Sequence, residues 1–215
     1  DNLDDSNIDS NYACTYYPWV KTYDSDNNQY IYLPPTKDVV KNFAYTDNTA
    51  YPWFPAAGYS RGQISGVNPK KVLKLSEQDE LYGGRINFIN KFASEGMRIW
   101  GDKNLQVAES QMNRISKRRL LVRIRKLLSI ACIGLIFDPN DNTTVKSFKS
   151  AVEPILDDIR NKRGLTDYRI EVDDSQEARD RLELPAKIYL KLQPNLEYID
   201  ISFVITPSGA NFDDV

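Results

Sequence analysis

Histidine does not occur in this sequence of 215 residues. It is the usual general base of serine and cysteine hydrolases and a frequent zinc ligand. Only two cysteines are present, Cys14 and Cys132, and their wide separation indicates neither a disulfide framework nor a metal-binding knuckle. These absences argue against a histidine-dependent active site and a transition-metal centre. We expect Cys132 to be a small buried core residue.

Long apolar runs are also missing, since the longest, around "LLSIACIGLIF", is shorter than the roughly 18 residues that span a bilayer. The acidic start "DNLDDSNIDSN" does not resemble a signal peptide, and the absence of an initial methionine suggests a fragment or processed product. With a net charge of −2, the chain as a whole lacks the excess of positive charge that would attract nucleic acid or an anionic membrane. The composition is typical of a soluble globular protein, and the lack of paired cysteines favours an intracellular one.

The first part of the chain predicts short strands and helices. "YPWVKTYDSDNNQYIYLPP" indicates two strands around a "DSDNN" turn, and "TKDVVKNFAYTDN" indicates a helix with Thr36 as N-cap. Residues 67–75 predict a short strand. In "SEQD", Ser76 and Asp79 fit a capping box for a short helix.

The second part predicts strands "RINFINKF" and "GMRIW", followed by two long helices. The first helix, about 113–133, carries a leucine-rich stripe. The second, about 143–162, contains Pro154, which predicts a kink, and Gly164 at its C′ position. Three strands follow, "DYRIEV", "PAKIYLKL" and "LEYIDISFVI", the last two as a hairpin around "QPN".

These elements predict an α/β (α+β) fold in which a mixed β-sheet packs against two long helices, with a smaller N-terminal strand and loop region. We expect residues 1–66 to end a preceding domain and residues 67–215 to form a C-terminal domain. No glycine-rich phosphate loop is present, so we expect no nucleotide cofactor.

The stretch "GYSRG" at residues 58–62 fits the G-x-S-x-G elbow of α/β-hydrolases, with Ser60 as nucleophile. That elbow lies between a strand and a helix, whereas prolines and glycines flank this stretch on both sides. With no histidine to activate Ser60, we interpret Gly58 and Gly62 as turn residues. A hydrolase fragment whose histidine lies elsewhere is the alternative.

The run "NRISKRRLLVRIRK" is strongly basic, and helical projection places five of its cations opposite the leucine stripe. This pattern fits a face that binds an acidic protein surface, a solvated face, or a nucleic-acid-binding module. No aromatic residue interrupts the run, which disfavours nucleic acid. The five cations are Arg118, Arg119, Arg123, Arg125 and Lys126.

Two further patterns concern acids and the end of the chain. Carboxylates cluster over residues 167–183, but their spacing fits no calcium loop, so we interpret them as solvated. In the terminal strand, residues 197–205, one face is strongly apolar, which indicates a paired strand or an edge that accepts a neighbour. The acids are Asp167, Glu171, Asp173, Asp174, Glu177, Asp180 and Glu183. The apolar face consists of Ile199, Ile201, Phe203 and Ile205.

Four stretches in order resemble the C-terminal part of contractile tail sheath proteins: "INFINKFASEGMRIWGDKNL", "NRISKRRLLVRIRKLL…LIFDPND", "RGLTDYRIEVDD" and "KIYLKLQPNLEYIDISFVITPSG". Upstream, "YPWVK", "LPP" and "PAAGYSRG" also fit. The resemblance covers about residues 14–207, and "TPSGANF" is most similar to sheaths of large contractile-tailed bacteriophages.

The resemblance implies a structural protein of the virion, assembled in the host cytoplasm, without catalysis or cofactor. Sheath subunits form stacked hexameric rings around a tail tube and contract to drive the tube through the host envelope. Their C-terminal domain faces the tube and links neighbours by exchanged strands. The implied partners are further copies, the tube protein, and baseplate and tail terminator proteins. The basic helix would face the tube or a neighbour, and the terminal strand would be a linking arm.

Overall fold

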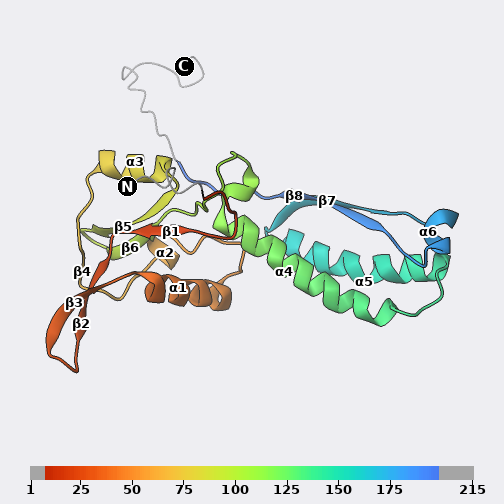
Figure 1. Ribbon diagram of the computed structural model, residues 1–215, viewed down its shortest axis with the longest axis horizontal. Coiled ribbons are helices and arrows are strands. Elements are labelled where there is room, and N and C mark those ends of the chain that lie inside the picture. The colour runs from red at the N-terminus through yellow and green to blue at the C-terminus, as the bar shows by residue number, and fades with distance from the viewer. Residues whose placement is uncertain (1–7, 199–215) are drawn as a thin grey trace, which may run out of the picture.

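Two hydrophobic cores organise residues 8–198, the part of the chain that the computed structural model describes (Figure 1). The first core gathers apolar side chains from the strand-rich region at one end of an elongated molecule. The second lies among two long helices and a β-hairpin toward the other end. The fold is α+β, as predicted. The second core is formed by α4 (Ile115–Cys132), α5 (Asn142–Asn161), β7 (Leu165–Val172) and β8 (Ala186–Leu192).

The strand-rich end is built on β5 (Ile86–Phe92), the middle strand of a three-stranded sheet. It pairs antiparallel with β6 (Gly96–Trp100) and parallel with β1 (Thr15–Tyr17). The predicted pair of strands "RINFINKF" and "GMRIW" is therefore confirmed. The parallel partner comes from far upstream, which ties the first residues of the chain to this sheet.

Helices cover the sheet, with α3 (Leu75–Gly83) and α1 (Thr36–Thr49) on opposite sides of it in Figure 1. Polar residues in β5 are buried as a result, and they bond to backbone. Asn87 donates to two backbone carbonyls and accepts one backbone N–H. Asn90 accepts from the N–H of Leu73 and donates to its carbonyl. These amides fix the loops that pass beside the strand.

The predicted hairpin around "DSDNN" is confirmed as β2 (Val20–Asp24) and β3 (Gln29–Leu33). The strand predicted over residues 67–75 is wrong except for β4 (Asn68–Pro69), which pairs with β2. One further backbone bond follows, from the N–H of Lys70 to the carbonyl of Trp19 at 2.8 Å, and the strand ends there.

Two predicted helix starts are displaced by one or two residues. Pro35, not Thr36, occupies the N-cap position of α1. Proline fixes φ near the helical value, which suits a helix start. In α3 the backbone N–H of Lys74 donates to Glu77 Oε2 at 2.9 Å, so the box predicted at Ser76 is wrong.

The two predicted long helices are confirmed within two residues at each end. Leu120 and Leu156 are fully buried where α4 and α5 meet. Trp53, only 5% exposed, joins this core from the aromatic loop, and its Nε1 donates to the carbonyl of Lys162 at 3.0 Å. Within residues 8–198, no helix has both the length and the apolar character needed to cross a membrane.

Helix α5 has a well-defined start and end. Asp141 is the N-cap, and its Oδ1 accepts hydrogen bonds from the backbone N–H groups of Thr143 and Thr144. At the other end Arg163 has a φ of 64°, so Arg163, and not the predicted Gly164, holds the left-handed C′ position. Gly164 permits close packing, since a Cβ there would lie 2.6 Å from the Ile159 side chain. The predicted kink at Pro154 stays a prediction.

Strand β8 pairs antiparallel with β7, from Leu165 opposite Leu192 to Val172 opposite Ala186. The hairpin predicted around "QPN" is not formed by the described residues, because 193–198 contain no strand. Beyond Tyr198 the predicted terminal strand lies outside the described residues. Its apolar face, Ile199, Ile201, Phe203 and Ile205, lies outside them as well.

Residues on both sides of the predicted domain boundary at position 66 share the first core. Val20 and Ile64 pack there with Ile89 and Ile99. Trp53 belongs to the second core instead, so the first 66 residues contribute to both. The division into 1–66 and 67–215 stays a prediction about the longer protein.

Candidate functional site

The "GYSRG" stretch forms a one-turn helix, α2 (Gly58–Arg61), in which Ser60 is exposed. Gly58 has a φ of 81°, which favours glycine. Gly62 is buried, and a Cβ there would lie 2.6 Å from the carbonyl oxygen of Ile99. Gly58 is therefore a turn residue as predicted, whereas Gly62 is required by close packing and not by its backbone conformation. The arrangement gives Ser60 no feature of a nucleophile elbow beyond its pattern.

The two cysteines and the acidic cluster form no site among the described residues. Cys14 and Cys132 are free and half-buried, so Cys132 is less buried than predicted. Burial raises the pKa of both thiols, which disfavours the reactive thiolate. Across residues 8–198, no group of acids, histidines or cysteines is arranged to hold a metal ion. Most acids of 167–183 are exposed along β7 and around α6 (Gln176–Asp180).

Helix α4 carries the five predicted cations, and two of them are committed to contacts inside the molecule. The Arg118 guanidinium lies over the Tyr12 ring at 4.3 Å, and its Nη1 donates to the Tyr12 hydroxyl. Arg119 forms an ion pair with Asp47 at 2.5 Å and lies over the Phe43 ring. These contacts fasten α4 to α1 and to the first residues described.

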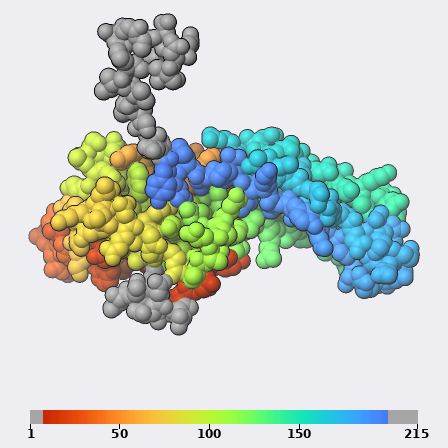
Figure 2. Space-filling model, turned by 90° about the horizontal axis from the view of Figure 1, so that it is seen from above, coloured from red at the N-terminus to blue at the C-terminus, as the bar shows by residue number. Residues whose placement is uncertain are grey.

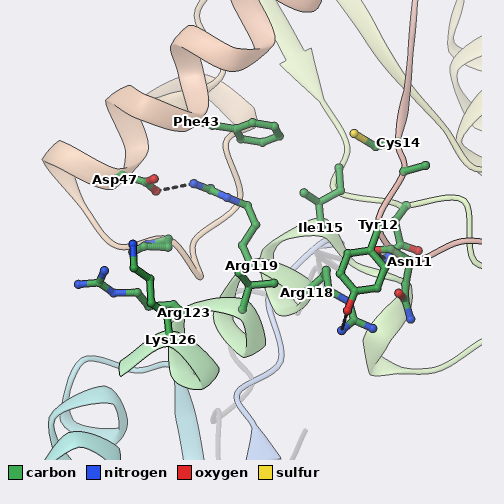
Figure 3. A pocket seen from close by; sticks show the side chains of 14 residues that line it. Asn11, Tyr12, Cys14, Phe43, Asp47, Ile115, Arg118, Arg119, Arg123 and Lys126 are labelled. Atoms are coloured by element: carbon green, nitrogen blue, oxygen red, sulfur yellow. Dashed lines mark hydrogen bonds and ion pairs between the residues drawn. The ribbon is translucent and has the colours of Figure 1, made fainter. Parts of the chain in front are cut away.

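The remaining three cations, Arg123, Arg125 and Lys126, are exposed and have no ion pair within residues 8–198. Arg123 and Lys126 lie at the rim of a cleft of about 460 Å³ between α4, α1 and residues 11–14 (Figure 3). Phe43 and other apolar side chains contribute to its lining. We call it the basic cleft. Arg125 lies outside it.

A second cluster, at the start of α4, holds the last described residues of the chain. Arg114 Nε and Nη2 donate to the two carboxylate oxygens of Glu197, and the Tyr82 hydroxyl also donates to Glu197 at 3.0 Å. Lys117 Nζ donates to Asn195 Oδ1 at 2.9 Å. We call these five residues the exit anchor. In Figure 2 this end of the described chain, in deep blue, lies on the surface beside α3, in yellow.

A buried carboxylate, that of Asp102, lies beside the exit anchor. Burial raises the pKa of Asp102 to about 6, although hydrogen bonds from Ser116 and the charges of Lys117 and Arg114 oppose this. Burial also disfavours ionisation of Glu197, but the hydrogen bonds and charge of Arg114 hold its pKa below the usual value. Glu197 therefore stays ionised and paired at neutral pH.

The exit anchor was not predicted from the sequence. Its partners are far apart, 83 positions in the case of Arg114 and Glu197. One local signal was available, because Arg114 and Lys117 place positive charge at the N-terminus of a helix, where the dipole disfavours it. Such cations need carboxylate or carbonyl partners from elsewhere.

Known proteins resemble this chain over almost its whole length. No family model matches it. The tail sheath protein of Vibrio phage KVP40 is 34% identical over 99% of the chain, and that of Enterobacteria phage T4 is 29% identical over 97%. The chain is homologous to phage tail sheath proteins. It spans 32% of the length of each of these two relatives.

The fold of this chain also has a solved counterpart. A PVC sheath complex of an extracellular contractile injection system, in its contracted state, aligns with a TM-score of 0.85 and 23% identity. The alignment covers 98% of the chain and 59% of that structure's chain. The contracted helical sheath of the anti-feeding prophage aligns with a TM-score of 0.83 and 20% identity. The phage relatives confirm the sheath resemblance predicted from the sequence motifs, and the solved structures share the fold.

Proposed function

We propose that this chain is the part of a structural, non-enzymatic contractile sheath subunit through which subunits join. The whole protein would polymerise as stacked hexameric rings around a tail tube, and contraction would drive the tube through the host envelope. Homology to phage tail sheath proteins across nearly the entire chain carries the proposal. The subunit would assemble in the host cytoplasm and remain in the virion, contacting the tube, baseplate and tail terminator proteins.

The sheet of β7 and β8 supports a role in linking subunits. Within the described residues each of these strands has only one ladder neighbour, so each leaves one backbone edge for a further strand. A strand from a neighbouring subunit could add there through main-chain hydrogen bonds. The terminal strand 197–205 of another copy, with its apolar face, has the pattern for this addition.

The exit anchor supports the same role. Because Glu197 and Asn195 bind the start of α4, residues 193–198 run from β8 to that helix and form no strand back along β8. A terminal strand that follows this anchor would add to the sheet of a neighbouring subunit.

The exposed face of α4 supports a contact with the tube or a neighbour. Arg123, Arg125 and Lys126 have no ion pair within residues 8–198, so their charge is available to an acidic surface. Arg118 and Arg119 would contribute indirectly, by fixing the orientation of the helix.

Electron microscopy of the full-length protein tests the proposal. The wild type should form tubular polymers, whereas truncation after Pro194 should abolish them. Ile201→Pro should also abolish them, because proline removes a ladder donor, and Ile201→Val is the matched control that keeps both donor and apolar side chain. A folded Ile201→Pro variant that builds normal tubes would contradict the linking role, and a wild type that never polymerises would contradict the proposed function.

A further inference from the structure

The basic cleft has unused binding capacity. Its one acid, Asp47, is already paired with Arg119, so the charges of Arg123 and Lys126 are not neutralised from within the cleft. Its lining is mainly apolar, with Phe43 and Ile115 among the contributing side chains. At about 460 Å³, it falls in the range of roughly 300–1,000 Å³ typical of pockets that bury a ligand group. Apolar groups flanked by carboxylates would suit it.

The opposite end of the second core presents such groups. At the end of the molecule formed by α6 and the loop before α5 (Figure 1), Phe137 is fully exposed and Leu182 is 89% exposed. The two loops are joined, since Asn140 Nδ2 donates to the carbonyl of Glu183 at 2.8 Å. We call this end the apolar tip.

The backbone at the apolar tip is unusual. Phe137 has a φ of 75° and Leu182 a φ of 57°, both in the left-handed region that bulky residues rarely adopt. Holding two large apolar side chains in this conformation and in water is unfavourable, and such strain tends to persist at contact sites. The pattern indicates a surface that becomes buried against a partner.

Carboxylates flank the apolar tip. Asp138 follows Phe137, and Asp180 lies two residues before Leu182. Neither acid forms an ion pair within residues 8–198, whereas Glu183 is paired with Arg181. Asp138 and Asp180 therefore match the unpaired Arg123 and Lys126 of the basic cleft in charge and number.

From this complementarity we infer that the apolar tip of one copy docks into the basic cleft of another copy. Phe137 and Leu182 lie against the apolar lining, and Asp138 and Asp180 pair with Arg123 and Lys126. A copy does not fill its own cleft, because the cleft lies between α4, α1 and residues 11–14, whereas the tip lies beyond the end of α4, at the end of the molecule farthest from the strand-rich region (Figure 1).

The contact joins two different surfaces, so it is heterologous. Repeated contacts of this kind close into a ring or continue as a helix. The inference therefore rests on the proposed function, since only a polymerising subunit uses it. It adds a contact made by side chains to the strand addition at β7 and β8.

Charge reversal in the full-length protein tests the docking. Arg123→Glu with Lys126→Glu reverses the cleft, and Asp138→Lys with Asp180→Lys reverses the tip. Each pair alone should lower the fraction of polymer at least tenfold in tube-free sedimentation assays. All four changes in one chain should restore most of it, because the two surfaces are again opposite in charge. Lys146→Glu and Glu153→Lys, on exposed positions of α5, are matched controls that should polymerise as the wild type does.

The outcomes separate the two proposals. A wild type that forms no polymer overturns the proposed function. A wild type that polymerises while both reversals remain harmless overturns the docking alone. Two harmful reversals whose combination is not restored also overturn it, since the cleft then binds something other than the tip. A cleft reversal harmful only in the presence of tubes likewise overturns it and identifies the tube as the occupant.

A cross-link provides an independent measurement. Val122 lines the cleft and is half-exposed, so a Val122→Cys copy mixed with a Leu182→Cys copy should form a disulfide-linked dimer in polymers. Replacing Val122→Cys by Lys146→Cys should abolish the dimer. Equal cross-linking from both positions would show that the contact is not specific and would overturn the docking.

Discussion

Arg114 and Glu197 form a bidentate ion pair across 83 positions of sequence, with about a fifth of each side chain exposed. Arg114→Ala should release residues 193–198 and lower the free energy of unfolding by about 1.5–3 kcal/mol, the range for hydrogen bonds to charged groups. Hydrogen exchange at the amides of 195–198 should accelerate markedly. Arg114→Lys, which keeps the charge but not the paired geometry, should be intermediate. Unchanged exchange in Arg114→Ala would contradict the anchoring role.

Asp102 should make stability depend on pH in the opposite sense to most acids. Its folded pKa of about 6 lies above the ordinary 3.8, so the native state binds this proton more tightly than the unfolded chain does. Stability from this group is therefore greatest below pH 4 and falls as the pH rises toward 6. Asp102→Asn removes that dependence.

The difference in unfolding free energy between Asp102→Asn and wild type should accordingly shift toward the variant by about 2 kcal/mol between pH 4 and pH 7. Denaturant titrations at several pH values measure it, and taking the difference cancels the other acids. A difference that stays constant over this range would show that burial does not raise the pKa of Asp102.

Trp53→Ala should destabilise the fold by roughly 3–5 kcal/mol, because it removes a buried indole from the second core along with its hydrogen bond to the Lys162 carbonyl. Tyr59→Ala, at a ring about half exposed, should cost much less, and Ser60→Ala should stay within about 0.5 kcal/mol of wild type. Thermal unfolding measures all three. An assembly defect in Ser60→Ala, with the fold intact, would reopen a functional role for that serine.

Gly62→Ala should destabilise by about 1–3 kcal/mol, because its Cβ would meet the Ile99 carbonyl and backbone cannot move aside cheaply. Gly83 is the matched control. A Cβ on Gly83, at the end of α3, would meet nothing within 4 Å, so Gly83→Ala should be neutral or slightly stabilising. Equal losses for the two variants would rule out the steric explanation.

Arg119→Glu and Arg123→Glu should differ, although the sequence suggests two equivalent exposed cations. Arg119→Glu breaks the ion pair with Asp47 and places two carboxylates side by side. The free energy of unfolding should fall by about 1–2 kcal/mol, a loss between those typical of exposed and of buried ion pairs. Arg123→Glu should cost under about 1 kcal/mol. If chemical denaturation gives the same loss for both, the Asp47 contact contributes nothing to stability.

The sequence predicted what local patterns determine. The stripe through Leu120 and Ile124 repeats within a few residues, so helix α4 and its buried face could be recognised. The β2–β3 hairpin was predictable because its turn residues are contiguous. The starts of α1 and α3 were misplaced because Pro35 occupies the N-cap position of α1 and because Glu77 caps the N–H of Lys74, whereas Thr and Ser are the usual N-cap residues.

What the sequence did not predict depends on tertiary neighbours. Arg118 and Arg119 look like solvated cations until Tyr12 and Asp47 are placed beside them. Phe137 looks like a core residue in an apolar run, yet its backbone turns it outward. The exit anchor could not be recognised because its ion pair joins Arg114 to Glu197, which are 83 positions apart in the sequence.

The position of the exit anchor determines how mechanical load would enter this fold. A pull on the chain beyond Tyr198 reaches Glu197 first, and from there it passes to Arg114 on α4 and Tyr82 on α3. Strand β8 lies behind this attachment and bears tension only after it gives way. Force is thereby divided between the start of α4 and helix α3, which packs against β5, and the β7–β8 ladder is spared from being peeled open one bond at a time.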